Sequence, residues 1–233
     1  ACLALALLVI AFGSTAFARN QVWESPLGLW SDVIRKNPQS LRGHTNLASA
    51  LADAGRYHEA AAHYRYSLTI NPTSGDAVTY YNLGNALKKM GNPEEAESSY
   101  RKAIDLNPRY SEAYNNLGRI FQERGDLDKA EEHFLKASSL NRYNVEPRNN
   151  LAMIYVNQGA FDKAAKQYAE ILEFDRENVT ALNNMANCLI LAGKVKEGVP
   201  QFEKALALRP EDPKLHYNMA MVLSQLDRLE EAE

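Results

Sequence analysis

Residues 114–125 read YNNLGRIFQERG, and this stretch decides the fold because its pattern recurs along the chain. Blocks that open with Asn followed by Leu or Met return at spacings of 36, 34, 34, 34 and 34 residues. The six blocks are NLASAL (46–51), NLGNAL (82–87), NLGRIF (116–121), NLAMIY (150–155), NMANCL (184–189) and NMAMVL (218–223). Self-similarity at such a period indicates a repeat architecture, in which each repeat is one supersecondary unit.

Each block is followed at fixed distances by three further residue types. A turn residue comes first, at Gly55, Gly91, Gly125, Gly159, Gly193 and Asp227. A small residue follows, at Ala60, Ala96, Ala130, Ala164, Gly198 and Ala232, and then an aromatic one, at Tyr64, Tyr100, Phe134, Tyr168 and Phe202. The order predicts two helices joined by a tight turn in every unit.

The helical period supports this interpretation. In the third unit Tyr114, Leu117, Gly118 and Phe121 share one face at i, i+3, i+4 and i+7. The eighth position of every unit is Gly or Ala, so we expect the second helix to approach the first closely there. One helix pair cannot bury both of its faces, and stacking of the units is therefore expected to create the core.

These features resemble the tetratricopeptide repeat, a 34-residue helix–turn–helix, over residues 22–233. The resemblance implies an all-α fold, a right-handed α-solenoid of tetratricopeptide repeats preceded by an apolar, transmembrane-like helix. Arg142 and Arg176 depart from it where proline is expected, and residues 72–76 lengthen one linker. The units expected are 22–40 (an N-terminal half-repeat that caps the stack), 41–74, 77–110, 111–144, 145–178, 179–212 and the truncated sixth repeat 213–233.

Residues 1–18, ACLALALLVIAFGSTAFA, carry no charge and leave two interpretations open. Ala16-Phe17-Ala18 fits the cleavage pattern of a signal peptide, although no basic n-region precedes it. Alternatively, the segment is the end of a transmembrane helix, with Trp23 just beyond it at the membrane interface. Both interpretations predict a membrane-anchored or exported chain, with the repeats periplasmic, extracytoplasmic or lumenal.

The composition excludes several classes of function. A net charge of −3 argues against a nucleic-acid partner. Cys2 and Cys188 make neither a disulfide framework nor a zinc site, and Cys188 is expected to be a buried thiol. The histidines, His44, His58, His63, His133 and His216, are scattered and show no metal-binding spacing. We therefore expect no enzyme activity, cofactor or metal within these residues.

The sixth position of every unit is asparagine, at Asn46, Asn82, Asn116, Asn150, Asn184 and Asn218. This position lies opposite the core face and is expected to line the concave side of the superhelix. Six mid-helix asparagines cost roughly 4 kcal/mol against alanine. An amide both donates and accepts hydrogen bonds and so matches a peptide backbone. The array resembles the asparagine ladder of O-linked N-acetylglucosamine transferases, which implies peptide binding, extended by Asn115, Asn149 and Asn183 at the fifth position and Asn85 and Asn187 at the ninth.

An alternative is that the amides bond to neighbouring helices or to water. Two further groups face the same expected groove. Lys88, Lys89 and Arg119 form a small basic area, more simply explained as a solvated mixed-charge face. An apolar group follows them, at Met153, Val156, Ile190, Leu191 and Met221.

The function predicted is a protein–protein interaction scaffold that binds an extended polypeptide. The junction A-F-A-R-N-x-x-W-x-S-x-x-x-L-W-x-D-x-x-R-K-N-P, ending at Pro38, resembles the transmembrane and tetratricopeptide repeat family, whose members are implicated in protein O-mannosylation. That resemblance implies an alternative function, the substrate-recruiting region of a membrane-embedded glycosyltransferase, with any active site upstream of Ala1.

Overall fold

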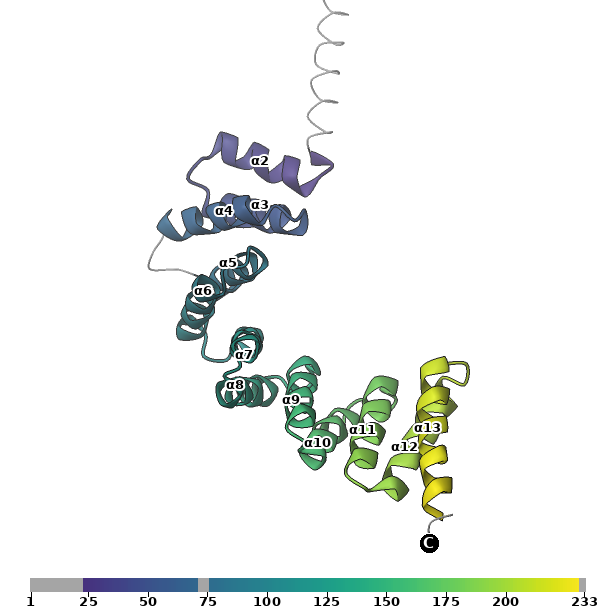
Figure 1. Cartoon of the computed structure of the whole chain (residues 1–233). Helices are drawn as coiled ribbons and strands as arrows, with labels where there is room; N and C mark the ends of the chain where they lie inside the picture. The colour runs from purple at the N-terminus through teal and green to yellow at the C-terminus, as the bar shows by residue number, and fades with distance from the viewer. Residues whose placement is uncertain (1–22, 71–75, 231–233) are drawn as a thin grey trace, which may run out of the picture. The chain divides into compact units, whose positions relative to one another are not determined.

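The computed structural model describes residues 23–70 and 76–230, with side chains up to Ser224. Within these residues the chain forms twelve α-helices and no strand (Figure 1). The chain divides into two compact units, Ala1–Arg109 and Tyr110–Glu233. The prediction of an apolar helix over residues 1–18 lies outside the described residues. None of the helices that are described combines the length and the apolar character needed to cross a membrane.

The described part of the first unit consists of one single helix and two antiparallel pairs. Helix α2 packs on α3, α3 packs on α4, α4 on α5, and α5 on α6. The bounds are α2 Pro26–Lys36, α3 Leu41–Asp53, α4 Tyr57–Ile70, α5 Ala77–Lys89 and α6 Pro93–Leu106.

The second unit continues the same alternation of A helices, the first of each pair, and B helices, the second. Two A helices of this unit also contact the next A helix along the chain, α7 with α9 and α11 with α13. The bounds are α7 Ser111–Arg124, α8 Leu127–Leu140, α9 Glu146–Asn157, α10 Phe161–Leu172, α11 Val179–Leu191, α12 Val195–Leu208 and α13 Pro213–Glu230.

Glycine ends the A helix of each complete pair. Gly125 has φ +84°, and the amide of the next residue, Asp126, donates to the carbonyl of Phe121 at 2.9 Å. A left-handed residue is nearly free of cost only for glycine, so the turn is fixed by this residue type. The same positive φ occurs at Gly55, Gly91, Gly159 and Gly193.

The predicted turn at Asp227 is wrong. Helix α13 runs without interruption from Pro213 to Glu230 and passes through this position. Aspartate pays a steric penalty in the left-handed conformation that glycine does not pay. The α-helical path therefore continues where the other units reverse.

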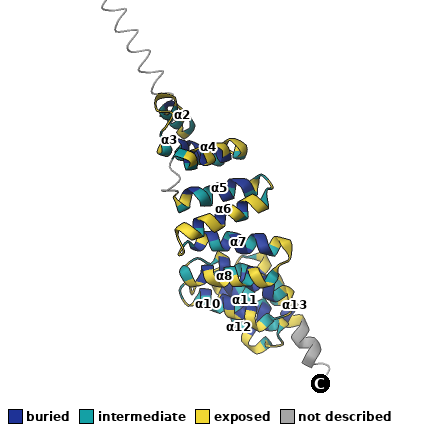
Figure 2. Ribbon diagram, turned by 90° about the vertical axis from the view of Figure 1, so that its left-hand side faces the viewer, coloured by how far each residue is buried: buried dark blue, intermediate teal, exposed yellow. Residues whose placement is uncertain are grey.

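The close approach of the B helix at the eighth position is present in the structure. A Cβ atom placed on Gly118 would lie 2.6 Å from Cε1 of Phe134, and one on Gly84 would lie 2.6 Å from Cε1 of Tyr100. Both rings are completely buried. Helices α3 to α12 each carry buried and exposed residues, as expected for stacked amphipathic helices (Figure 2).

The predicted burial of Cys188 is also observed. Its side chain is 3% exposed on α11, and burial raises the pKa of the thiol to about 11. The thiol is therefore protonated at neutral pH and serves as a small apolar group in the core.

Helix α2 lies within the predicted N-terminal half-repeat, residues 22–40. Ile34 of α2 lies against Gly43 of α3, whose added Cβ would meet its Cγ2 atom at 3.0 Å. Asp32, buried on α2, accepts hydrogen bonds from Lys36, Arg35 and the indole of Trp23. Hydrogen bonds from Lys36 and Arg35 lower the pKa of Asp32 to about 2.

A buried arginine organises the loop in which Arg142 replaces the expected proline. Arg148, 7% exposed in the first turn of α9, donates Nη1–H to the carbonyl oxygen of Arg142 at 2.9 Å. Its Nε–H donates to Glu170 of α10 at 3.2 Å. The guanidinium also lies 5.9 Å from the ring centroid of Phe174, which makes an edge-to-face contact with Tyr143. Side-chain bonds here fix a loop that proline restricts in other units.

We predict that Gly118→Val lowers the free energy of unfolding by about 2 kcal/mol, because the added atoms overlap the buried Phe134 ring. Chemical denaturation followed by circular dichroism measures the change. The control is Gln122→Val on the same helix, where the added cost is only that of helix propensity, a few tenths of a kcal/mol. Equal stability of the two variants would contradict the close packing.

Arg148→Ala is predicted to destabilise the chain by about 2 kcal/mol or more, because it removes a buried cation that holds both a loop carbonyl and Glu170. Arg142→Ala is the matched control. It removes an exposed ion pair with Glu173, worth at most about 1 kcal/mol, and an exposed contact with the Tyr143 ring, and it leaves the loop carbonyl in place. Thermal unfolding of the two variants under identical conditions compares them, and similar melting temperatures would refute the central role of Arg148.

Candidate functional site

The predicted asparagines lie on the A helices α3, α5, α7, α9, α11 and α13. All six sixth-position asparagines are half-buried, so each is partly covered by neighbouring residues and partly open to solvent. Asn149, Asn183, Asn85 and Asn187 are half-buried as well. Asn115 is the exception, at 2% exposure, and a ligand on this surface would therefore not meet its side chain.

Two pairs of amides connect successive A helices of the second unit. The Nδ2 atom of Asn150 on α9 donates to Oδ1 of Asn115 on α7 at 3.1 Å. The Nδ2 atom of Asn218 on α13 donates to Oδ1 of Asn183 on α11 at 2.8 Å. In both pairs the sixth-position amide binds the fifth-position amide of the preceding repeat. We call these two pairs the amide rungs.

Other predicted amides also have partners inside the protein. Asn85 accepts a hydrogen bond from the hydroxyl of Tyr100 at 2.8 Å, which joins α5 to α6. Asn183 donates to Oδ1 of Asn184 at 3.0 Å, and Asn184 is hydrogen-bonded to the hydroxyl of Tyr168. Part of the asparagine array therefore holds helices together, as the alternative interpretation of the sequence expects.

Four of the predicted amides keep their hydrogen-bonding capacity. Among the described residues, none forms a side-chain hydrogen bond with Asn46, Asn82, Asn149 or Asn187. The amide rungs are also only partly used, because Asn150 and Asn218 each contribute one N–H and an amide offers two N–H groups and a carbonyl oxygen. Asn150 and Asn218 therefore each keep one N–H group and the carbonyl oxygen.

Apolar side chains lie on the same A helices of the second unit. Met153 of α9, Leu191 of α11 and Met221 of α13 are 47%, 58% and 50% exposed. Tyr217 of α13, 67% exposed, belongs with them but was not predicted. It occupies the fifth position of its repeat, directly before Asn218, and this position could have predicted it from the sequence. We call Met153, Leu191, Tyr217 and Met221 the apolar row.

The prediction for Ile190 is wrong. Ile190 packs against the cluster of Ala186, Phe202 and Val222, and a Cβ atom added to Gly198 would meet its Cγ1 atom at 2.8 Å. Glycine at position 198 leaves a space between α11 and α12, and the isoleucine side chain turns inward to fill it. Val156, half-buried on α9, is not an open surface residue either.

The residues of the predicted basic area belong to two different units. Lys88, half-buried, and Lys89, exposed, belong to the first unit. Arg119 belongs to the second, where its Nη1 atom lies 3.5 Å from Glu146 Oε1 on the next A helix. The charges on this surface are mixed, and the ion pair is a third inter-repeat link beside the amide rungs.

The repeat layout agrees with several solved structures. The C-terminal part of a TPR repeat-containing protein from Cytophaga hutchinsonii superposes with a TM-score of 0.74 at 17% identity, covering 91% of this chain and 84% of that one. YrrB, a TPR protein with an unusual peptide-binding site, gives 0.62 at 21% identity, covering 81% and 96%. The MamA protein gives 0.64 at 22% identity, covering 75% and 94%. At these identities the likeness shows the fold alone.

Protein O-mannosyl-transferase TMTC1 from human and from mouse is 32% identical to the chain over 72 residues, which are 31% of this chain. The matched stretch is only 8% of the length of those relatives. The model of the cilia and flagella-associated protein 70 C-terminal domain matches far more, residues 20–233. The chain is therefore a tetratricopeptide repeat protein and belongs to the family of the cilia and flagella-associated protein 70 C-terminal domain.

Proposed function

We propose that the chain is a protein-interaction scaffold whose second unit binds an extended polypeptide along its A helices. The observation that carries this proposal is the combination of amides with unused hydrogen-bonding groups and an exposed apolar row on α9, α11 and α13. An extended segment would offer its backbone N–H and C=O groups to the amides and its side chains to the apolar row.

The amides suit a backbone because each presents a donor and an acceptor together. Asn149 and Asn187, which have no side-chain partner among the described residues, are available for such contacts at no structural cost. Asn150 and Asn218 would contribute only the groups that their rungs leave over. Recognition by amides alone would depend little on the sequence of the bound segment.

The apolar row would supply the selectivity. Met153, Leu191, Tyr217 and Met221 are each between 47% and 67% exposed, and methionine adapts to partners of different shape. Burial of such side chains contributes roughly 25 cal/mol per Å² of apolar area. The proposed ligand is therefore a polypeptide segment with apolar side chains. That YrrB is described as having a peptide-binding site on a related fold supports the proposal.

Two single substitutions separate a structural role of the amides from a role in binding. Asn150→Ala is predicted to cost about 1–3 kcal/mol, because it leaves the buried Oδ1 of Asn115 without its donor. Asn187→Ala is predicted to change the free energy of unfolding by less than about 0.5 kcal/mol. Urea denaturation measures both values. If Asn150→Ala were as stable as Asn187→Ala, the hydrogen bond between Asn150 and Asn115 would not contribute to stability.

Binding is tested with peptides selected by the folded chain from a random peptide library, titrated calorimetrically. The double variant Met153→Asn with Leu191→Asn is expected to bind the selected peptides at least about tenfold more weakly, since each loses an apolar contact worth about 1 kcal/mol or more. The control pair is Leu135→Asn with Leu208→Asn, which are 44% and 40% exposed on the B helices α8 and α12. Equal affinities of the two double variants would refute a peptide site on the A helices.

A second candidate is a substrate-recruiting region of a membrane-anchored O-mannosyltransferase, with the repeats extracytoplasmic or lumenal. The observation that favours it is the 32% identity to protein O-mannosyl-transferase TMTC1 over 72 residues. In that case the A helices would hold a polypeptide for a catalytic domain elsewhere in the protein. Coding sequence upstream of Ala1 would distinguish the two candidates. Many apolar spans and an acidic pair in the first loop would support the glycosyltransferase, and their absence would support the scaffold.

A further inference from the structure

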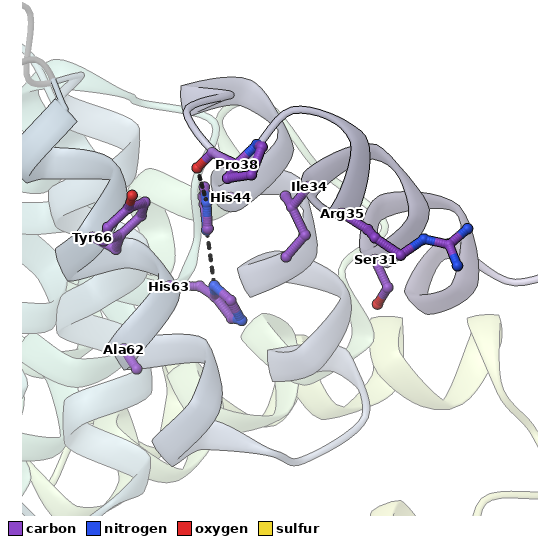
Figure 3. Close-up of a pocket in the computed structure, with 8 residues that line it drawn as sticks. All are labelled: Ser31, Ile34, Arg35, Pro38, His44, Ala62, His63 and Tyr66. Carbon is purple, nitrogen blue, oxygen red and sulfur yellow. Dashed lines mark hydrogen bonds between the residues drawn. The ribbon is translucent and has the colours of Figure 1, made fainter.

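A pocket of about 570 Å³ lies in the first unit among α2, α3 and α4 (Figure 3). Its walls include Ile34 and Arg35 of α2, His44 of α3, and His63 and Tyr66 of α4. The sequence suggested that the histidines are scattered, but α3 and α4 bring two of them into contact here. Neither the repeat pattern nor the proposed peptide surface accounts for this pair.

The two imidazoles are hydrogen-bonded through their Nδ1 atoms, which are 2.9 Å apart. The Nε2 atom of His44 lies 3.0 Å from the carbonyl oxygen of Pro38. A carbonyl oxygen only accepts, so this Nε2 atom carries the hydrogen and the neutral ring keeps a lone pair on Nδ1. His63 then supplies the hydrogen of the bond between the rings. His44 is thus held in one tautomer with its lone pair directed at His63.

This arrangement matches what a metal-binding histidine requires. A ligating imidazole usually donates its other N–H to a carbonyl or a carboxylate, which orients the ring, and Pro38 plays that part for His44. His44 is 7% exposed, and the centroid of its ring lies 4.4 Å from that of Tyr66, so the position of the ring is restricted. His63 is half-buried and lines the pocket, so its ring has room to turn.

The hydrogen bond between the two rings has to open before an ion can bind. The Nδ1 atoms are 2.9 Å apart, so an ion about 2.05 Å from Nδ1 of His44 along its lone pair would overlap Nδ1 of His63. The His63 ring therefore has to turn, and its place in the wall of the pocket gives it room to do so. Imidazole nitrogens are suitable ligands for Zn²⁺, Cu²⁺ and Ni²⁺.

The charged side chains near the pocket are paired with side chains of opposite charge, so their net effect on a bound cation is small. Arg35 at the pocket pairs with Asp32, so its charge is largely balanced. Glu59, one turn before His63 on α4, is held by Arg56 at 2.7 Å. No cluster of three or more His, Cys, Asp or Glu side chains suited to a metal occurs in the described part of the chain. Water would therefore complete the coordination, which is expected in a pocket open to solvent.

We propose that the first unit binds one divalent transition-metal ion, such as Ni²⁺, Cu²⁺ or Zn²⁺, through Nδ1 of His44 and Nδ1 of His63. On binding, the hydrogen on Nδ1 of His63 is lost to solvent and Nε2 of the same ring takes one up, so both lone pairs reach the ion without net proton release. The ion would join α3 to α4 beside α2. The proposal is independent of peptide binding by the second unit.

The test is a titration of the full chain with NiCl₂, followed by NMR of the five imidazole rings. Paramagnetic Ni²⁺ is expected to broaden the signals of His44 and His63 first, with one ion bound per chain by calorimetry. His63→Ala, a change at a half-buried position, is expected to weaken this binding at least about tenfold. Circular dichroism checks that the variant remains helical.

His58→Ala is the matched control, because His58 is an exposed residue of the same helix. It should leave the affinity for Ni²⁺ unchanged. Broadening of His58, His133 or His216 at the same Ni²⁺ concentration as His63 would overturn the proposal, and so would equal affinities of His63→Ala and the unsubstituted chain. His44→Gln, which removes the Nδ1 ligand, should lose the ion in the same way as His63→Ala.

Discussion

The close approach of a B-helix aromatic ring to the eighth residue of its A helix is the constraint on which each repeat depends. At Gly84 and Gly118 a single added carbon would lie 2.6 Å from a ring atom of Tyr100 or Phe134. The rings are completely buried and cannot move far. Glycine within a helix costs about 1 kcal/mol against alanine, and the contact with a large buried ring offsets that cost. The small residue, the aromatic residue and the glycine turn between them therefore have to occur together in one repeat.

The sequence predicted the features that depend on such local constraints. The helix pairs, the five glycine turns, the close approach of the B helix and the buried Cys188 all follow from residue type and period. Features that depend on contacts between side chains of different helices were harder to predict from the sequence. The inward turn of Ile190 depends on the absence of a side chain at Gly198 on another helix. The anchoring of the Arg142 carbonyl depends on Arg148 and Glu170, which a period of 34 residues does not relate to one another.

The asparagines lie between these two cases. Their register correctly placed them on the A helices, but the register alone could not distinguish a partner in the protein from a partner in a ligand. Asn115 and Asn183 at the fifth position lie beside the sixth-position amide of the next repeat, and each pair forms a hydrogen bond between repeats. Asn149 is at the fifth position as well, yet Asn184 bonds to Asn183 and Tyr168 instead. The choice between these partners depends on side-chain positions to within an ångström, which a repeat pattern does not contain.

A structural role and a binding role are compatible in this array. A side-chain amide offers two N–H groups and two lone pairs, and a rung uses one group from each partner. The energetic cost of mid-helix asparagine, roughly 4 kcal/mol for six, is partly offset by bonds such as that of Asn150, since a typical net hydrogen bond contributes about 1 kcal/mol. The bonds inside the protein also fix the rotamers of the amides before any ligand arrives. Less side-chain entropy is then lost when the remaining groups bind a backbone. An amide that holds two repeats together is, for this reason, better prepared for a polypeptide than one that rotates freely.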